Sequence, residues 1–279
     1  MPQIDPIAIG SAYTDLALEA AMLKQVNIGL ALFAYEAKAN TWKASSEKLR
    51  KEGLLDKVLE EVKRIEQLKK DGDPQAFSAY LTNLSSKVQH GDKAALYVYN
   101  DVLLPSAMES KTIAFTRQMS LVYLVAKFEN FLERMLSLML SVTPAVMKDR
   151  TISLAELLSI PTIDDARKAV SEKVAKDVMY EGIDKLAAYL SGHWGICLDD
   201  YGRWDLFTER FYRRNIIIHN SGLPNQLYRE KTKYHGPDKA LVVDQQYITD
   251  SINIFNEVAE KLMKSMMLRF VARVEPSTE

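Results

Sequence analysis

Apolar residues recur at helical spacing along nearly the whole chain. From about residue 15 to residue 39 they form a heptad-like stripe of Leu16, Leu23, Leu30 and Ala37, with Val26 and Phe33 between them. The stretch 40–71 is highly charged and keeps one narrow apolar seam, which consists of Leu55, Val58, Val62 and Ile65. This pattern predicts a helix that lies on one neighbour and leaves most of its surface in water.

The sequence predicts a long helix over about 112–141, because large apolar residues fall there at i, i+3 and i+4 spacing. They are Leu121, Leu124, Val125, Phe128, Phe131, Leu132, Met135 and Met139. Such a face is typical of the central helix of a core. Thr143 and Pro144 are expected to end it. A short helical piece at 153–158 and a helix over 164–190 are expected to follow.

The next helix is expected to begin near Trp204, after a loop over 192–202 in which His193 packs. It should end at Asn220-Ser-Gly222, because Gly222 suits a left-handed cap at the end of a helix. Its buried side chains are predicted to include Phe207, Phe211, Ile217 and Ile218.

The last helix is expected to start after Asp244, a good capping residue, and to reach about Phe270. Leu241–Val243, just before it, indicates a very short extended piece. The buried face of this helix is predicted to consist of Ile248, Ile252, Phe255, Ala259, Leu262 and Met266.

The whole pattern predicts an all-α protein with a break near Pro105. Residues 106–279 are expected to form a bundle of four to five helices. Residues 1–105 are expected to form an additional helical region, and their sequence does not indicate its role.

The 279 residues carry a formal net charge of −1, so the chain is no polycation and any nucleic-acid contact requires a local patch. The stretch 203–233 supplies one, with seven basic residues against three acidic ones. It is either a binding patch or a solvated helix with i,i+4 pairs such as Glu209 with Arg213. The single cysteine, Cys197, excludes an internal disulfide and a multi-cysteine metal site. We expect a cytoplasmic protein with no membrane segment, since no apolar run approaches the length needed to span a bilayer.

Arg214-Asn-Ile-Ile-Ile-His219 carries candidate chemistry. A guanidinium fork suits two phosphate oxygens, and an imidazole exchanges protons near neutral pH. Asn215 could hold the imidazole or an oxygen in place. Together they fit metal-independent RNA cleavage, in which the 2′-hydroxyl of the substrate attacks the adjacent phosphorus. The spacing alone is unspecific, since Arg229 and His235 also match it, but an asparagine directly after the arginine makes the first match more specific.

In such a reaction His219 would act as general base or acid, and Arg214 would stabilise the transition state. A second proton-transfer group is then needed. A two-fold dimer would supply a second His219, which we favour over His235 of the same chain. The alternative is a structural role, in which His219 only caps the end of the helix or is a hydrogen-bonded polar residue there. Glu129 is either a site carboxylate or a buried partner for Arg213 or Arg214.

The motif and its surroundings resemble the HEPN superfamily (higher eukaryotes and prokaryotes nucleotide-binding domain). The resemblance covers roughly residues 110–272. Its landmarks are Arg213–Gly222 with Asn225 and Tyr228, Phe128-Glu129, Tyr189-Leu190 leading to Trp194-Gly-Ile196, and Leu241–Tyr247.

The resemblance implies a helical bundle that dimerises, so that two motifs line one cleft and cut RNA without metal or cofactor. It implies that Arg214 and His219 are the catalytic pair and Asn215 the polar position, with Glu129, Arg213 and Asn220 in possible supporting roles. Many members of the superfamily are toxins or antiviral defence effectors held in check by a protein partner. Others are non-catalytic RNA- or nucleotide-binding or dimerisation modules, which is the alternative for this chain.

Overall fold

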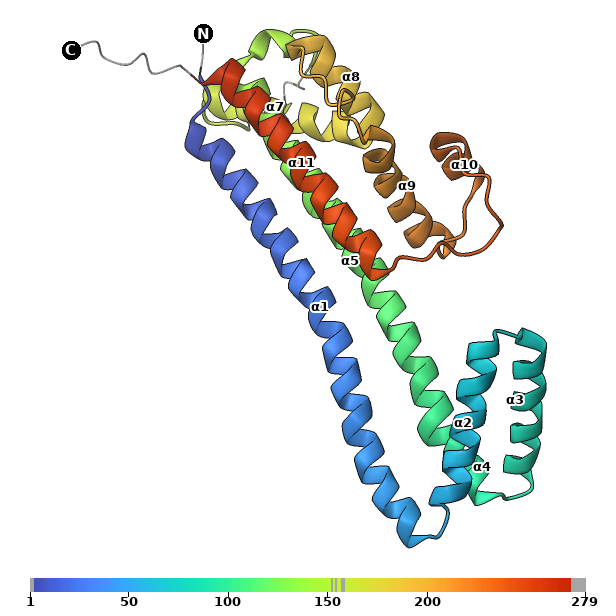
Figure 1. Cartoon of the computed structure of the whole chain (residues 1–279). Helices are drawn as coiled ribbons and strands as arrows, with labels where there is room; N and C mark the ends of the chain where they lie inside the picture. Colours follow the sequence, from blue (N-terminus) through green and yellow to red (C-terminus); the bar gives the residue numbers. More distant parts are fainter. Residues whose placement is uncertain (1–2, 152, 154, 157–158, 272–279) are drawn as a thin grey trace. The chain divides into compact units, whose positions relative to one another are not determined.

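The computed structural model describes residues 3–151, 153, 155–156 and 159–271, with the side chains of residues 31–41 left out. Its regular elements are all helices, and no strand occurs among the described residues (Figure 1). The predicted all-α class is therefore confirmed. Leu241–Val243 belongs to no strand. The predicted helical piece at 153–158 falls largely outside the described residues.

The chain divides into two compact units. Unit 1 comprises Met1–Val26 and Arg117–Glu279, and unit 2 comprises Asn27–Thr116. This division differs from the expected boundary at residues 105 and 106. Two long helices, α1 (Pro6–Lys51) and α5 (Leu104–Val142), each contribute to both units.

Pro105 does not interrupt the chain, contrary to the sequence prediction. Helix α4 (Lys93–Tyr97) continues through a π-helical segment, η1 (Val98–Leu103), directly into α5. A proline inside an α-helix cannot donate a hydrogen bond and clashes with the carbonyl four residues earlier, here that of Asp101. Asp101 lies in the wider π turn, which provides the room that the proline ring needs.

Unit 2 is built around the apolar seam of α2 (Leu55–Asp71). Val58 and Ile65 are buried there, and the rest of its core consists of Leu49, Tyr80, Leu84, Ala94, Ala95 and Val98. The neighbours of α2 include α4 and α3 (Pro74–Gln89), whose first turn is capped by Asp73. The seam therefore packs on neighbouring helices, as predicted. The charged stretch is nevertheless two helices, because α1 ends at Lys51 and Gly53 adopts a left-handed conformation with φ 69°.

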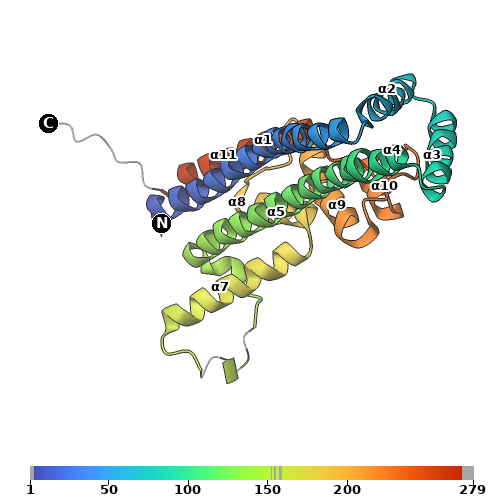
Figure 2. The same cartoon turned by 90° about the horizontal axis from the view of Figure 1, so that it is seen from below.

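Unit 1 gathers the remaining helices along the second part of α5 (Figure 2). They are η2 (Pro144–Met147), α7 (Ile163–Tyr180), α8 (Ile183–Trp194), α9 (Trp204–Asn220), α10 (Gln226–Thr232) and α11 (Gln245–Phe270). Phe128 on α5 is fully buried at the centre. Its ring contacts Phe207 and Phe211 of α9 and stacks on Phe255 of α11, with ring centroids 5.4, 6.4 and 4.7 Å away. The predicted faces of α5 and α11 are thus confirmed as core.

The predicted helix over 164–190 is two helices, since Gly182 has φ 97° between α7 and α8. Helix α8 then runs on to Trp194, where Gly195 forms a left-handed cap, so His193 lies in a helix rather than in the expected loop. There its ring contacts that of Tyr189 in a tilted arrangement, with ring centroids 4.3 Å apart.

The first part of α1 belongs to unit 1, where Ile9, Leu16 and Leu23 join the core and ion pairs connect it to α5. Asp15 pairs with Arg134 at 3.0 Å, and Glu19 accepts from Lys127 at 2.7 Å and from Tyr123 at 2.7 Å. The Lys127 ammonium and the Tyr123 hydroxyl hold the pKa of Glu19 below its usual value. None of the described helices combines the length and the apolar character required to cross a membrane.

Candidate functional site

Helix α9 carries the candidate residues, and its core contacts fix how it is rotated. Phe207 and Phe211 face Phe128 of α5. Arg214 follows Phe211 by about one turn, so its side chain also points towards α5. The helix ends abruptly, because Ser221 and Gly222 both adopt left-handed conformations, with φ 51° and 78°. The Gly222 amide then donates to the Ile216 carbonyl at 2.9 Å. The predicted left-handed end is present, although it begins one residue earlier than expected.

Arg214 reaches across to α5. Its Nη2 donates a short hydrogen bond to Oε1 of Glu129, and both side chains are partly buried. Its Nε is buried without a partner among the described residues. Glu129 is therefore the partner of Arg214 and not of Arg213, which pairs with Glu209 instead.

Glu129 has a raised pKa, because burial disfavours its charged form more than Arg214 favours it. Ionisation of the Glu129 carboxyl is therefore less favourable in the folded chain than in water. The ion pair of Glu129 with Arg214 is therefore weak evidence for a role of Glu129 in stability.

His219 and Asn215 lie on another face of the same helix, and both are exposed. They are four residues apart and share that face, whereas Arg214 is about 140° away from His219 around the axis. No hydrogen bond between Arg214 and His219 occurs among the described residues. One copy of the chain therefore presents the two candidate groups on different sides of α9. Asn220 instead serves the turn, since its Nδ2 donates to the Leu223 carbonyl at 2.7 Å.

The prediction that Ile218 belongs to the core is wrong. Its side chain is 48% exposed, whereas Ile216 is 1% exposed and Ile217 is also buried. Successive residues on an α-helix are rotated by about 100°, so only two of three consecutive isoleucines can face neighbouring elements. An exposed apolar side chain thus lies directly beside His219.

A buried cluster centred on Glu209, which we call the Glu209 hub, joins α9, α10 and α11. The Glu209 carboxylate accepts from Tyr228 at 2.6 Å, Tyr247 at 2.6 Å, Arg213 at 2.9 Å and Arg210 at 3.2 Å. The Arg210 and Arg213 side chains are only 6% and 12% exposed. Their guanidinium groups lie 4.5 and 4.9 Å from the centroid of the Tyr247 ring.

The hub gives Arg213 a structural role that the sequence did not reveal. Its Nη1 also donates to the Val242 carbonyl at 3.3 Å and so holds the segment before α11. The predicted pair of Glu209 with Arg213 is present, but it is buried rather than solvated. Tyr228 and Tyr247, noted only as landmarks, are the signal in the sequence that could have indicated a buried cluster.

The basic patch of residues 203–233 is mostly paired inside the protein. Outside the hub, Arg203 lies 3.6 Å from Glu257, Arg229 lies 2.5 Å from Asp238, and Lys231 lies 2.9 Å from Asp184. Arg229 also donates to the Gly236 carbonyl at 2.9 Å and holds the loop that carries His235. In the second match, Arg229 therefore lies in α10 and His235 lies exposed in the loop that follows.

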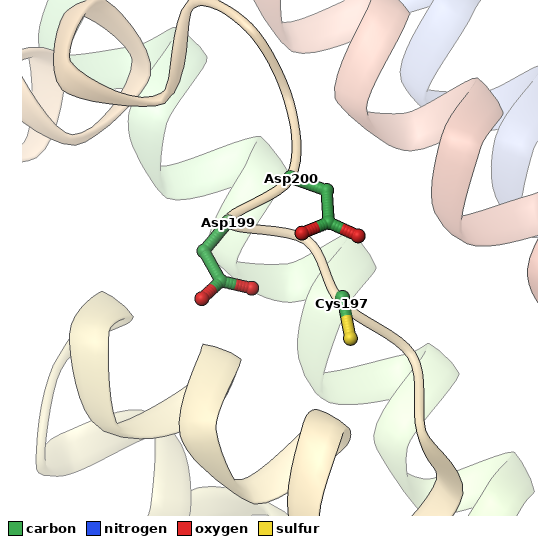
Figure 3. Close-up of side chains that lie close together, drawn as sticks. All are labelled: Cys197, Asp199 and Asp200. Carbon is green, nitrogen blue, oxygen red and sulfur yellow. The ribbon is translucent and has the colours of Figure 1, made fainter.

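Three potential metal ligands lie together on the loop after α8 (Figure 3). They are Cys197, Asp199 and Asp200, whose ligand atoms all lie within 4.8 Å of one another. Both carboxylates are exposed, and the Cys197 Sγ lies 3.5 Å from Oγ of Ser191. Exposed acidic groups on a short loop are common without an ion, so this arrangement assigns no metal chemistry.

The chain was compared with known proteins in three ways. It matches no protein-family model, no curated protein and no solved structure. What the site can do must therefore be inferred from the contacts of Arg214, the exposure of His219 and the hub that fixes α9.

Proposed function

We propose that this chain is a metal-independent endoribonuclease of the HEPN type. The observation that carries the proposal is the contact of Arg214 with Glu129 near the end of α9. The last turn of the same helix exposes His219. A guanidinium oriented by a carboxylate and an accessible imidazole are two of the groups that phosphodiester cleavage by a neighbouring hydroxyl requires.

In the proposed reaction the 2′-hydroxyl of the RNA attacks the adjacent phosphorus. A bond forms between O2′ and phosphorus, and the bond between phosphorus and O5′ breaks. One imidazole accepts the proton of the 2′-hydroxyl and a second donates a proton to O5′, while Arg214 binds the oxygens on which negative charge develops. The products are a 2′,3′-cyclic phosphate and a free 5′-hydroxyl.

A homodimer supplies the second imidazole in this proposal. His219 and Arg214 of one copy lie on different faces of α9, and this supports a site that two copies complete. Exposed Ile218 lies beside His219 and provides apolar surface for such an association. A protein partner that covers the same surface would restrain the activity.

The first test is cleavage of single-stranded RNA by the purified protein in the presence of EDTA. We expect products that end in 2′,3′-cyclic phosphate, and we expect the rate to be unaffected by the chelator. A protein that cuts no RNA over a broad panel of sequences would contradict the proposal. In cells, growth inhibition that depends on His219 would support a role as a toxin or defence effector.

Glu129→Gln should lower kcat by roughly tenfold, because the amide no longer fixes Arg214 by an ion pair and small displacements at a site are costly. The unfolding midpoint should stay the same or rise. The raised pKa of Glu129 means that the folded chain favours the neutral form of this side chain. A neutral amide therefore removes the free energy that is needed to bury a charged carboxylate. Glu133→Gln, one turn further along α5, is the matched control. Loss of stability without loss of kcat would show that Glu129 serves the fold alone.

The alternative is a non-catalytic RNA- or nucleotide-binding or dimerisation module, and the internal pairing of the basic patch favours it. Arg203, Arg210, Arg213, Arg229 and Lys231 all have acidic partners. This alternative predicts that Arg214→Ala and His219→Ala leave the activity in cells intact. The seam of α2 does not offer a surface to a protein partner, since Val58 and Ile65 are buried in unit 2.

A further inference from the structure

A second group of polar side chains lies beside the candidate site on the same helix. The Tyr212 hydroxyl on α9 donates to Oδ2 of Asp184 on α8 at 2.8 Å. The Lys231 ammonium on α10 donates to the same oxygen at 2.9 Å. Three helices thus bring an aromatic ring and a cation together around one carboxylate oxygen.

This group lies on the His219 side of α9. Tyr212 precedes His219 by seven residues, which is almost two turns, so the two side chains differ by only about 20° around the axis. They are separated by about 10 Å along the helix. A strand of RNA whose scissile phosphate lies at His219 would extend over Tyr212 without changing face.

The Lys231 ammonium can bind a further group. It has three N–H donors, one of which is used by Asp184, and its side chain is 46% exposed. The hydrogen bond to Asp184 raises the pKa of Lys231, so the ammonium remains charged at neutral pH. Burial raises the pKa of Tyr212, which keeps the phenol neutral. The group therefore presents one cation and one uncharged ring, both bound to the Asp184 carboxylate.

We propose that Tyr212 and Lys231 form a subsite for a nucleotide that flanks the cleaved bond. The half-buried Tyr212 ring stacks on a base, and Lys231 binds a phosphate oxygen of the same strand. Asp184 positions both donors. An aromatic platform beside a cation is the combination that binds single-stranded nucleic acid with little sequence preference. The inference rests on the proposed function, because His219 defines where the cut occurs.

Binding of an uncleavable RNA tests the subsite separately from the chemistry. The probe is a fluorescein-labelled single strand of about ten nucleotides with 2′-O-methyl sugars, measured by anisotropy between about 50 and 200 mM salt. The proteins are the full chain and its Tyr212→Ala, Tyr212→Phe and Lys231→Gln variants. Lys264→Gln is the matched control, because Lys264 is also an exposed lysine paired with an acid, Glu260, at 2.6 Å.

Tyr212→Ala should weaken binding by roughly fivefold or more, whereas Tyr212→Phe, which keeps the ring, should bind within about twofold of the unaltered chain. Lys231→Gln should reduce the slope of log Kd against log salt by about 0.7, the value for one lost phosphate contact on a single strand. A merely structural lysine would not change this slope, and Lys264→Gln should leave it unchanged.

The two proposals fail in different ways. If the unaltered chain does not bind the probe, or if Tyr212→Ala and Lys231→Gln bind like the Lys264→Gln control, the subsite is wrong even where RNA is cleaved. If binding depends on Tyr212 and Lys231 but unmodified RNA stays intact, the subsite stands and the ribonuclease proposal falls.

Discussion

His219→Ala should reduce RNA cleavage in EDTA by roughly a hundredfold to ten-thousandfold, the range that loss of a general acid or base produces. The reason is that Arg214 can orient and stabilise a phosphate but cannot move a proton, so it does not replace the imidazole. The decrease should appear in kcat, measured by release of 2′,3′-cyclic phosphate ends. Binding of the 2′-O-methyl probe should change little.

His193→Ala is the control for this experiment, because His193 is also an exposed histidine near the end of a helix, but its ring contacts Tyr189. It should retain full activity. A mixed dimer of one unaltered and one His219→Ala copy should lose most of its activity if two imidazoles share one site. Equal cleavage by the unaltered chain and by His219→Ala would attribute the activity to a contaminant or to another site.

Glu209→Gln should lower the free energy of unfolding of unit 1 by about 3–5 kcal/mol, the cost of leaving buried charges without their partner. The amide has nearly the same shape as the carboxylate, yet it leaves the Arg210 and Arg213 guanidinium groups without a counter-charge. Urea denaturation followed by the fluorescence of Trp194 and Trp204, which lie in unit 1, measures the change.

Glu257→Gln is the matched control, since Glu257 also faces an arginine and a tyrosine but is half-exposed. It should cost no more than about 1 kcal/mol. A loss for Glu209→Gln that is no larger than this would mean that the hub contributes little to the fold.

The hub also makes the stability of unit 1 sensitive to alkaline pH. Burial, and then the negative charge of Glu209, raise the pKa of Tyr228 and Tyr247 above the ordinary value of 10.0. Because the folded chain holds these protons more tightly than the unfolded one, their contribution is complete below pH 10 and is lost progressively above it. Glu209→Gln should weaken this dependence.

Periodicity was enough to predict most of the core. Phe128 and Phe255 lie on apolar stripes whose spacing matches the helical turn, and this spacing alone predicts which face of each helix is buried. Breaks were harder to predict. Gly182 and Gly195 mark helix ends through their left-handed backbone, which the residue type permits but does not require.

The candidate site was predictable in its residues but not in their partners. Arg213 and Arg214 are neighbours with the same chemistry, and the sequence could not show which of them reaches Glu129. A rotation of about 100° between successive residues decides the question once Phe207 and Phe211 have fixed the orientation of α9. The Glu209 hub depends on residues up to 38 positions apart, which only the packing of α10 and α11 on α9 brings together.

The two left-handed residues end α9 directly after His219 and Asn220. If the helix continued for one more turn, residue 223 would lie over the imidazole on the same face, since it would follow His219 by four positions. Instead Ser221 and Gly222 turn the chain away immediately, and the ring stays open to solvent. The early end of the helix therefore keeps His219 exposed to solvent. A substitution that lengthened α9 by one turn would cover the imidazole without replacing any of the candidate residues.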